Sequence, residues 1–285
     1  MNLVEQVFIR LSTEPMAMGS TFINPAPSCK FIQEGSLSGH YWIQNTETGH
    51  PSYVYCDMTM TRRCCDSPGK WMRVAHLDMT DRNQHCPSVF TERSLPVRAC
   101  GKGHTSVCTS ITFSVKGVEY HRVCGKIIGY QYGHTDAFWS YFRNRRLTLN
   151  DHYVDGVSLT HGLNPRKHIW TLAAALDEKT PRFSIHRCPC SRTTEPYAGR
   201  IPPYVGNDYF CDTGSTLARW QNRFYHENPL WDGSGCNTTS TCCSFNNPPW
   251  FCKTISEPTT DDIELRLCAD GIEDVALESI EIYVQ

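Results

Sequence analysis

The sequence predicts a mainly antiparallel β protein with short helices, held together by disulfide bonds and located outside the cell. Several stretches alternate apolar and polar residues, as half-buried strands do. Sixteen cysteines are spread along the 285 residues. Such a content fits an oxidising compartment, because cytosolic thiols are kept reduced. Since short helices are also expected, an α+β arrangement is the alternative fold class.

The cysteine spacing favours disulfides over zinc sites. Structural zinc sites use paired ligands such as C-x2-C followed by a second pair. No C-x2-C occurs here, and the close pairs are adjacent or separated by one residue: Cys64-Cys65, Cys242-Cys243 and Cys188-Pro189-Cys190. A chain of about 300 residues buries enough surface to fold on its core alone. We therefore expect the bridges to add durability outside the cell.

Residues 1–27 are expected to form a helical arm and a linker ahead of one large disulfide-rich domain, residues 28–285. The apolar residues of 3–11 lie on one face of a helix, which Pro15 ends. This face either packs on its own domain or joins the helices of several copies. Residues 16–27 contain glycine, asparagine and two prolines, a composition typical of a linker.

The first residues do not have the pattern of a signal peptide, because Glu5, Arg10 and Glu14 interrupt the apolar run. No stretch approaches the ~18 apolar residues of a membrane span. Because the cysteines indicate secretion, the chain is expected to be a processed product or an incomplete gene model. The sequon that begins at Asn237 predicts a glycosylation site and agrees with passage through the secretory pathway.

Strands are expected in the body of the chain from their alternating patterns. Residues 107–115 alternate, Lys116-Gly117 supplies a turn, and residues 118–124 run back as a hairpin. Residues 154–161 and 168–175 form a second expected pair. The latter can instead be a helix that begins at Pro165, since three consecutive alanines favour a helix.

The last part of the chain contains two further alternating strands, at 263–267 and 280–284. The preceding region, residues 188–258, is rich in proline, glycine, asparagine, tryptophan and cysteine. We expect that region to lack long regular elements and to be held by its bridges.

An ordered series of motifs runs from Cys29 to Ala75. It comprises a cysteine, Ser38-Gly39-His40-Tyr41 followed by Trp42-Ile43, Val54-Tyr55-Cys56-Asp57-Met58 and Trp71-Met72-Arg73-Val74-Ala75. In order and spacing, residues 28–90 resemble the opening of a fibrinogen-like domain and of the related intelectin lectins. The resemblance implies a disulfide between Cys29 and Cys56.

The chain departs from that family at two levels. Gly69-Lys70-Trp71 stands where the family has Gly-Gly-Trp, and after about residue 90 no counterpart of the family's calcium loop or ligand pocket is found. The remainder is similar to uncharacterised cysteine-rich secreted proteins of sponges and cnidarians, on the segments 155–162 and 231–243. That similarity suggests an extracellular setting and no mechanism.

No pattern favours an enzyme. Asp212-Thr213-Gly214-Ser215 is the sequence of an aspartic protease loop, but two such aspartates must share one proton and the chain holds one copy. We therefore interpret Asp212 as a turn residue that bonds its own backbone. The twelve histidines form no H-E-x2-H or H-x3-H pattern, and G-x-S-x-G is absent. We accordingly expect no catalytic residues.

Acidic residues near the C-terminus suggest a calcium site. Carboxylate oxygens are the ligands that Ca2+ prefers, and six acids are the candidates: Asp261, Asp262, Glu264, Asp270, Glu273 and Asp274. Their spacing does not fit an EF-hand. The alternative is a solvated acidic edge strand, a common protection against edge-to-edge pairing.

Charge is unevenly placed, although the net charge is only −2. Residues 257–285 carry −8 and the rest carries +6. The acidic segment is expected either to face basic surface on a neighbouring molecule or to dock on its own body. No basic stripe with interleaved aromatics indicates nucleic-acid binding.

Two functional interpretations are consistent with these sequence features. The first is a non-enzymatic structural or scaffold protein of an extracellular matrix or mineralised skeleton, which assembles with itself or with other matrix proteins. The alternative is a lectin-like protein that recognises carbohydrate and uses calcium.

Overall fold

The computed structural model describes residues 16–60, 64, 68–93, 98–102, 108–131, 156–159, 167–172, 209–210, 250–268 and 275–285. Within these ranges the chain forms two β-sheets and a single turn of 3-10 helix, η1 (Cys29–Phe31). Almost all strand pairs are antiparallel, and β9 with β10 is the parallel exception. The prediction of a mainly antiparallel β protein is confirmed for the described residues.

The larger sheet has eight strands, and β13 lies at its centre. One edge of β13 pairs with β3 and then β5, and the other edge pairs with β7 along most of its length. The path β1-β2-β3-β13-β5-β4 is joined by β7 and β11. The strands are β1 (Gly39–Ile43), β2 (Ser52–Asp57), β3 (Trp71–Asp78), β4 (Thr91–Arg93), β5 (Ala99–Lys102), β7 (Tyr120–Gln131), β11 (Phe251–Thr259) and β13 (Val275–Val284).

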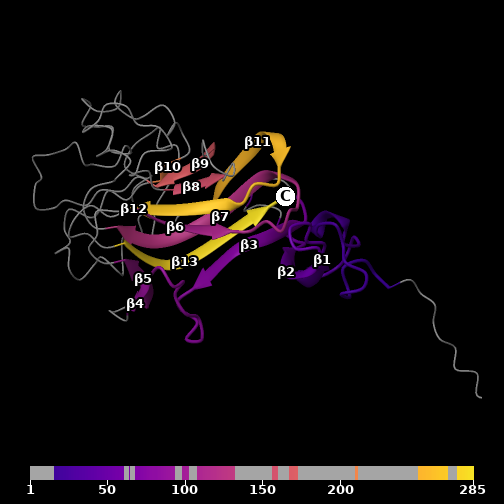
Figure 1. The fold of residues 1–285 in the computed structure, drawn as a ribbon, viewed down its shortest axis with the longest axis horizontal. Helices are drawn as coiled ribbons and strands as arrows, with labels where there is room; N and C mark the ends of the chain where they lie inside the picture. The colour runs from indigo at the N-terminus through magenta and orange to yellow at the C-terminus, as the bar shows by residue number, and fades with distance from the viewer. Residues whose placement is uncertain are drawn as a thin grey trace, which may run out of the picture.

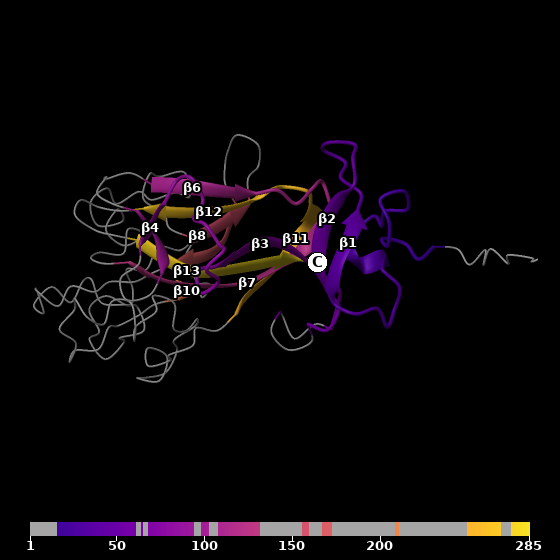
Figure 2. The same ribbon diagram turned by 90° about the horizontal axis from the view of Figure 1, so that it is seen from below.

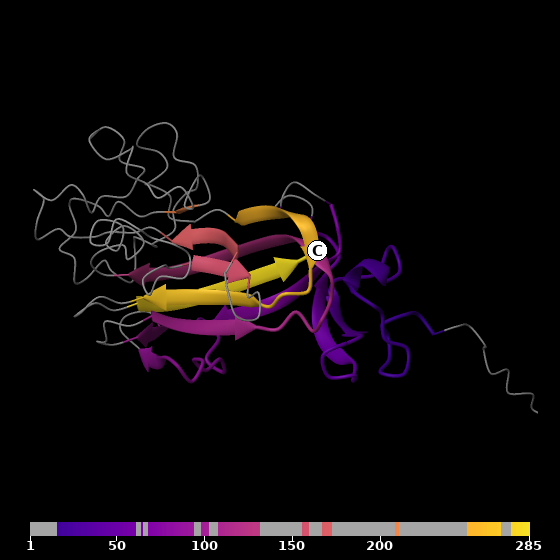
Figure 3. The ribbon, with the colours of Figure 1, turned by 45° about the horizontal axis from the view of Figure 1, so that its top comes forward.

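The smaller sheet has five strands in the order β10-β9-β8-β12-β6. Its centre is β12, which pairs with β6 on one side and β8 on the other. The strands are β6 (Cys108–Phe113), β8 (Gly156–Leu159), β9 (Lys167–Leu172), β10 (Tyr209–Phe210) and β12 (Ile263–Cys268). In Figures 1 and 3 this sheet forms a second layer over β13 and β7.

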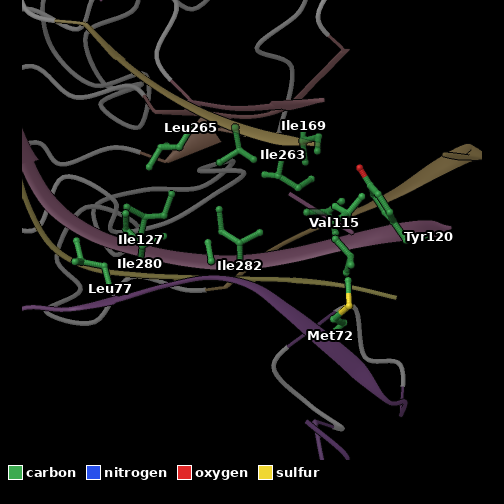
Figure 4. Close-up of a cluster of buried hydrophobic side chains, with 14 of the residues drawn as sticks. Met72, Leu77, Val115, Tyr120, Ile127, Ile169, Ile263, Leu265, Ile280 and Ile282 are labelled. Carbon is green, nitrogen blue, oxygen red and sulfur yellow. The ribbon is translucent and has the colours of Figure 1, made fainter. Parts of the chain in front are cut away.

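The core lies between the two layers. Along β12, Ile263 and Leu265 point toward the larger sheet, and Ile280 and Ile282 of β13 point back toward them (Figure 4). All four are fully or almost fully buried. The two-residue alternation of these strands gives each sheet one apolar inner face, which explains why the pattern at 263–267 and 280–284 predicted strands.

The expected hairpin at 107–124 is only half right. Both strands and the turn exist, and Lys116 and Gly117 have φ angles of 61° and 68°, as a tight hairpin turn requires. However, β6 pairs with β12 and β7 pairs with β11 and β13. Val115 and Val118, on either side of the turn, are buried. The chain therefore crosses from one sheet to the other here, and turn chemistry alone does not reveal it.

Residues 167–172 form β9, antiparallel to β8, so the strand reading is confirmed for these residues and the helix alternative is wrong. Ile169 is buried in the core between the sheets, and this packing outweighs local helix propensity. The helix expected at 3–11 lies outside the described residues.

The region 188–258 was expected to lack long regular elements, and its last part contradicts this. Residues Phe251–Thr259 form the nine-residue strand β11, in which Phe251 and Ile255 are buried. In the described residues β11 pairs only with β7. An edge position tolerates Pro258, which has no N–H to donate.

Residues 16–27 were expected to be a linker, but they pack along the edge of β1. The amide of Trp42 donates to the Gly19 carbonyl at 2.8 Å, and the amide of Ala26 donates to the Trp42 carbonyl at 2.9 Å. Ala26 is fully buried. Gly19 has φ of 80°, and a Cβ there would lie 2.5 Å from Cδ1 of Ile32, so only glycine fits this turn.

Candidate functional site: an aromatic surface on the first hairpin

The hairpin of β1 and β2 carries aromatic residues on one face. Opposite residues in the antiparallel register are His40 with Tyr55 and Trp42 with Tyr53. Because side chains alternate along a strand, these four lie on the same face. The intervening residues, such as Ile43 and Cys56, are buried in the core. We call the four aromatic residues, together with Phe22 and Arg73, the aromatic surface.

The rings of the aromatic surface contact one another in a continuous row. The ring of Phe22 meets Trp42 edge-on at 5.2 Å, and Trp42 lies 4.9 Å from Tyr53. His40 stacks on Tyr53 at 5.2 Å and meets Tyr55 edge-on at 5.4 Å. Each distance falls in the range of a favourable aromatic pair, so the neighbours fix one another's positions.

A cation ends the row. The Arg73 guanidinium lies over the Tyr55 ring at 4.3 Å, close enough for a cation–π interaction. Arg73 is opposite Tyr283 in the register of β3 with β13, so the two side chains share one face of the sheet. Burial raises the pKa of the Tyr283 phenol far above its usual value, so this group stays neutral and keeps its O–H.

The row runs from solvent into the protein. Tyr53 and Phe22 are 59% and 50% exposed, whereas Tyr283 is 3% exposed. Tyr283 belongs to a small buried cluster with Trp71 and the Cys64–Cys124 disulfide. The exposed half of the row is therefore anchored on a rigid interior.

The hairpin that carries the rings is well supported. Cys56, in the middle of β2, forms a disulfide with Cys29 with a Cα–Cα distance of 5.6 Å. This is the pair that the fibrinogen-like resemblance implies. At the end of β2, the Asp57 carboxylate accepts from the Ser38 hydroxyl at 3.2 Å and from the Thr59 amide at 2.9 Å. At the β1–β2 turn, buried Asn45 accepts two backbone amides and donates to Ser52.

Two further disulfides join described cysteines. Cys64 pairs with Cys124 and Cys86 with Cys100, with Cα–Cα distances of 5.3 Å and 5.4 Å. Cys252 is disulfide-bonded as well. The prediction of disulfide bonds is thus confirmed.

The described part of the proposed calcium cluster does not converge on one point. The Asp262 carboxylate accepts from the Val115 amide at 3.0 Å, and the Asp261 backbone carbonyl accepts from the Tyr120 hydroxyl at 2.6 Å. Glu264 is 3% exposed, in the middle of β12. No group of three or more potential ligand side chains gathers in the described ranges. Asp270, Glu273 and Asp274 lie outside them, and the calcium site stays a prediction.

The acidic C-terminal segment is built into the two sheets where the structure describes it. Residues 263–268 are the central strand of the smaller sheet, and residues 275–284 are the central strand of the larger one. These strands are thus part of the fold itself, and whether their charge faces a neighbouring molecule or the protein's own body stays a prediction. Asn237 and Asp212 lie outside the described residues. No helix among those described is long and apolar enough to cross a membrane.

The aromatic surface was not predicted as a site, although four of its six residues, His40, Trp42, Tyr55 and Arg73, belong to the motifs of the fibrinogen-like resemblance. The signal was present in two short patterns, His40-x-Trp42 and Tyr53-x-Tyr55. Two aromatics spaced by two on each strand of a hairpin share a face. Which face is solvent-exposed depends on the core beneath it, which comes from strands distant in the sequence.

Comparison with known proteins gives no match, neither to a family model nor to a curated protein nor to a solved structure. The fibrinogen-like fold of residues 28–90 therefore stays a prediction. Function has to be inferred from the described surface and its chemistry.

Proposed function

We propose that this chain is a non-enzymatic, secreted structural protein of an extracellular matrix or mineralised skeleton, which assembles through its aromatic surface. The observation that carries the proposal is the continuous row from Phe22 to Arg73, half exposed to solvent. Tryptophan, tyrosine and arginine are the residues that supply most binding energy at protein interfaces. The partner that we propose is a second copy of the chain or another matrix protein.

The arrangement of the rings supports binding in a second way. Association loses conformational freedom of interface side chains, at a cost of about 0.5–1.5 kcal/mol for each mobile side chain that becomes fixed. Here Trp42, Tyr53 and His40 already hold one another through ring contacts. Less freedom remains to be lost when a partner binds.

The covalent framework supports an extracellular role. Cys29–Cys56 fixes the hairpin itself, and Cys64–Cys124 belongs to the same buried cluster as Tyr283. Disulfides persist in oxidising spaces and limit unfolding there. A matrix protein has to keep its binding surface intact for long periods without renewal.

A second candidate is carbohydrate recognition on the same surface. Tyr53 is 59% exposed and its ring stacks on His40. An aromatic pair of this kind offers apolar surface beside polar groups, and sugar rings carry apolar C–H faces beside hydroxyls. The lectin resemblance of residues 28–90 also favours it. Calcium enters this candidate only if the acids at 261–274 bind the ion.

Sedimentation velocity of the folded, oxidised protein over a concentration series tests the first candidate. We expect the parent to self-associate and Tyr53→Ala to weaken that association at least tenfold. Phe31→Ala is the matched control, because Phe31 is 58% exposed and is no member of the row. A parent that stays monomeric at every concentration contradicts self-assembly. If a glycan array then gives binding that Tyr53→Ala abolishes, the second candidate replaces the first.

A further inference from the structure

Two cysteines lie at one end of the smaller sheet. Cys108 is the first residue of β6, and Cys268 is the last residue of β12. The antiparallel register places these two directly opposite each other.

We propose that Cys108 and Cys268 form a disulfide across β6 and β12. Directly opposite residues of an antiparallel pair have Cα atoms about 4.5–5.5 Å apart. Disulfides span about 4.4–6.8 Å between Cα atoms, and the three described bridges of this protein span 5.3–5.6 Å. The backbone therefore already meets the distance requirement, without any movement of either strand.

The register also gives the pair a common face. Along β12, position 268 is on the same face of the strand as Glu264 and Arg266. Along β6, position 108 is on the same face as Ser110 and Thr112. Ile263, Leu265 and Leu267 occupy the alternate positions, which face the core. The register positions of Cys108 and Cys268 therefore belong to the same face of the sheet, as a cross-strand bond requires.

The bond would fix the register of an edge strand. In the described residues β6 pairs only with β12. A shift of the β6–β12 register by one residue would turn the apolar side chains of β6 away from the core. The start of β6 and the end of β12 lie at the end of the sandwich opposite β1 and β2 (Figure 2). The bond is therefore remote from the aromatic surface and independent of the proposed function.

Formation of the bond needs a disulfide oxidant, such as oxidised glutathione or the disulfide of an oxidoreductase. The Cys108 thiolate attacks the oxidant's disulfide, and one oxidant thiol leaves. The Cys268 thiolate then attacks the mixed disulfide and releases the second oxidant thiol. Overall the two cysteines lose two protons and two electrons, and the oxidant is reduced to two thiols.

Tryptic mapping without reduction tests the proposal on the complete oxidised chain. Cleavage after Lys102, Lys116 and Arg266 yields peptides 103–116 and 267–285, each with a single cysteine. We expect these two peptides joined to each other, and separated after reduction. Recovery of either peptide linked to a third peptide, or of both as alkylated free thiols, overturns the proposal.

Thiol counts in denatured variants provide a second readout. Cys268→Ala should expose one new thiol per chain, at Cys108, and the double variant Cys108→Ala, Cys268→Ala should expose none. Two new thiols in the double variant would mean that each cysteine pairs elsewhere. Since the mapping uses the parent protein, a variant that fails to fold does not remove the test.

Discussion

The guanidinium carbon of Arg73 lies 4.3 Å from the centre of the Tyr55 ring. Arg73 is also directly opposite Tyr283 in the register of β3 with β13, and Tyr283 is 3% exposed. A single side chain thereby links the exposed rings of the first hairpin to the interior. Tyr55 and Tyr283 therefore share Arg73 as a neighbour.

Replacement of Arg73 should therefore loosen both ends of this link. We expect Arg73→Met to lower the free energy of unfolding by about 1–2 kcal/mol, because the cation–π contact with Tyr55 is lost. Urea unfolding measures the change. Arg82→Met, at an exposed position of a loop, is the control and should have almost no effect. Equal effects of the two substitutions would contradict the link.

Arg98 holds the loop that follows β3. Its guanidinium donates to the carbonyls of Met79, Asp81 and Gln84 at 3.3 Å, 2.7 Å and 2.9 Å, and pairs with Glu92 at 2.7 Å. We expect Arg98→Met to destabilise the protein by about 1–3 kcal/mol, because three carbonyls lose a charged donor.

The partner carboxylate of Arg98 provides the control. Glu92→Gln should cost less than about 1 kcal/mol, because the Glu92 side chain is 39% exposed and exposed ion pairs contribute little. Hydrogen exchange should accelerate at residues 79–85 in Arg98→Met and stay unchanged in Glu92→Gln. Unchanged exchange in both variants would show that Arg98 does not hold the loop.

Gly117 is predicted to tolerate a side chain less well than Gly35, another turn glycine with a positive φ. Its φ is 68°, and a Cβ there would lie 1.9 Å from Oγ1 of Thr46. We expect Gly117→Ala to cost about 2–4 kcal/mol, from backbone strain together with displacement of the β1–β2 turn. Gly35 has φ of 82° and open space around it, so Gly35→Ala should cost only about 1 kcal/mol. Thermal unfolding of both variants separates the steric effect from the conformational one.

Asp262 should make stability depend on pH. Burial raises the pKa of its carboxyl above the usual 3.8, and Glu47 and Asp261 add to this, whereas the Val115 amide and Lys116 act against it. The folded state therefore binds the proton more tightly than the unfolded state. The contribution of this group is most favourable below pH 3.8 and is lost as the pH rises through the raised pKa.

Asp262→Asn removes that titration and keeps an oxygen that can accept from the Val115 amide. Relative to the parent, the variant should become progressively more stable as the pH rises above 3.8, and the difference should then level off. Urea unfolding at a series of pH values measures it. A difference that stays constant with pH would contradict the raised pKa.

The alternation of apolar and polar residues predicts where strands occur, but it does not predict which strands pair with each other. The alternation of Ile263, Leu265 and Leu267 identifies β12 from its own residues. Nothing in Lys116-Gly117 indicates that β6 and β7 join different sheets, because that choice depends on β12 and β13, about 150 residues further along the chain. The linker reading of residues 16–27 failed for a similar reason, since the edge of β1 that binds them is visible only in the fold.

The candidate site shows the same division. The pairs His40-x-Trp42 and Tyr53-x-Tyr55 place four rings on one hairpin face from sequence alone. The contribution of Arg73 and the buried end at Tyr283 require β3 and β13 to lie beside that hairpin. Sequence reasoning can therefore find the rings of such a surface, while its anchoring comes from non-local pairing.

Assembly through the aromatic surface is tested most directly by hydroxyl-radical footprinting of the oxidised protein at concentrations below and above its association range. Tyr53 and Phe22 should lose reactivity several-fold on assembly, because their exposed faces become covered, while Phe31 keeps its reactivity. Assembled protein in which Tyr53 and Phe22 react as rapidly as in the monomer would contradict the proposed interface.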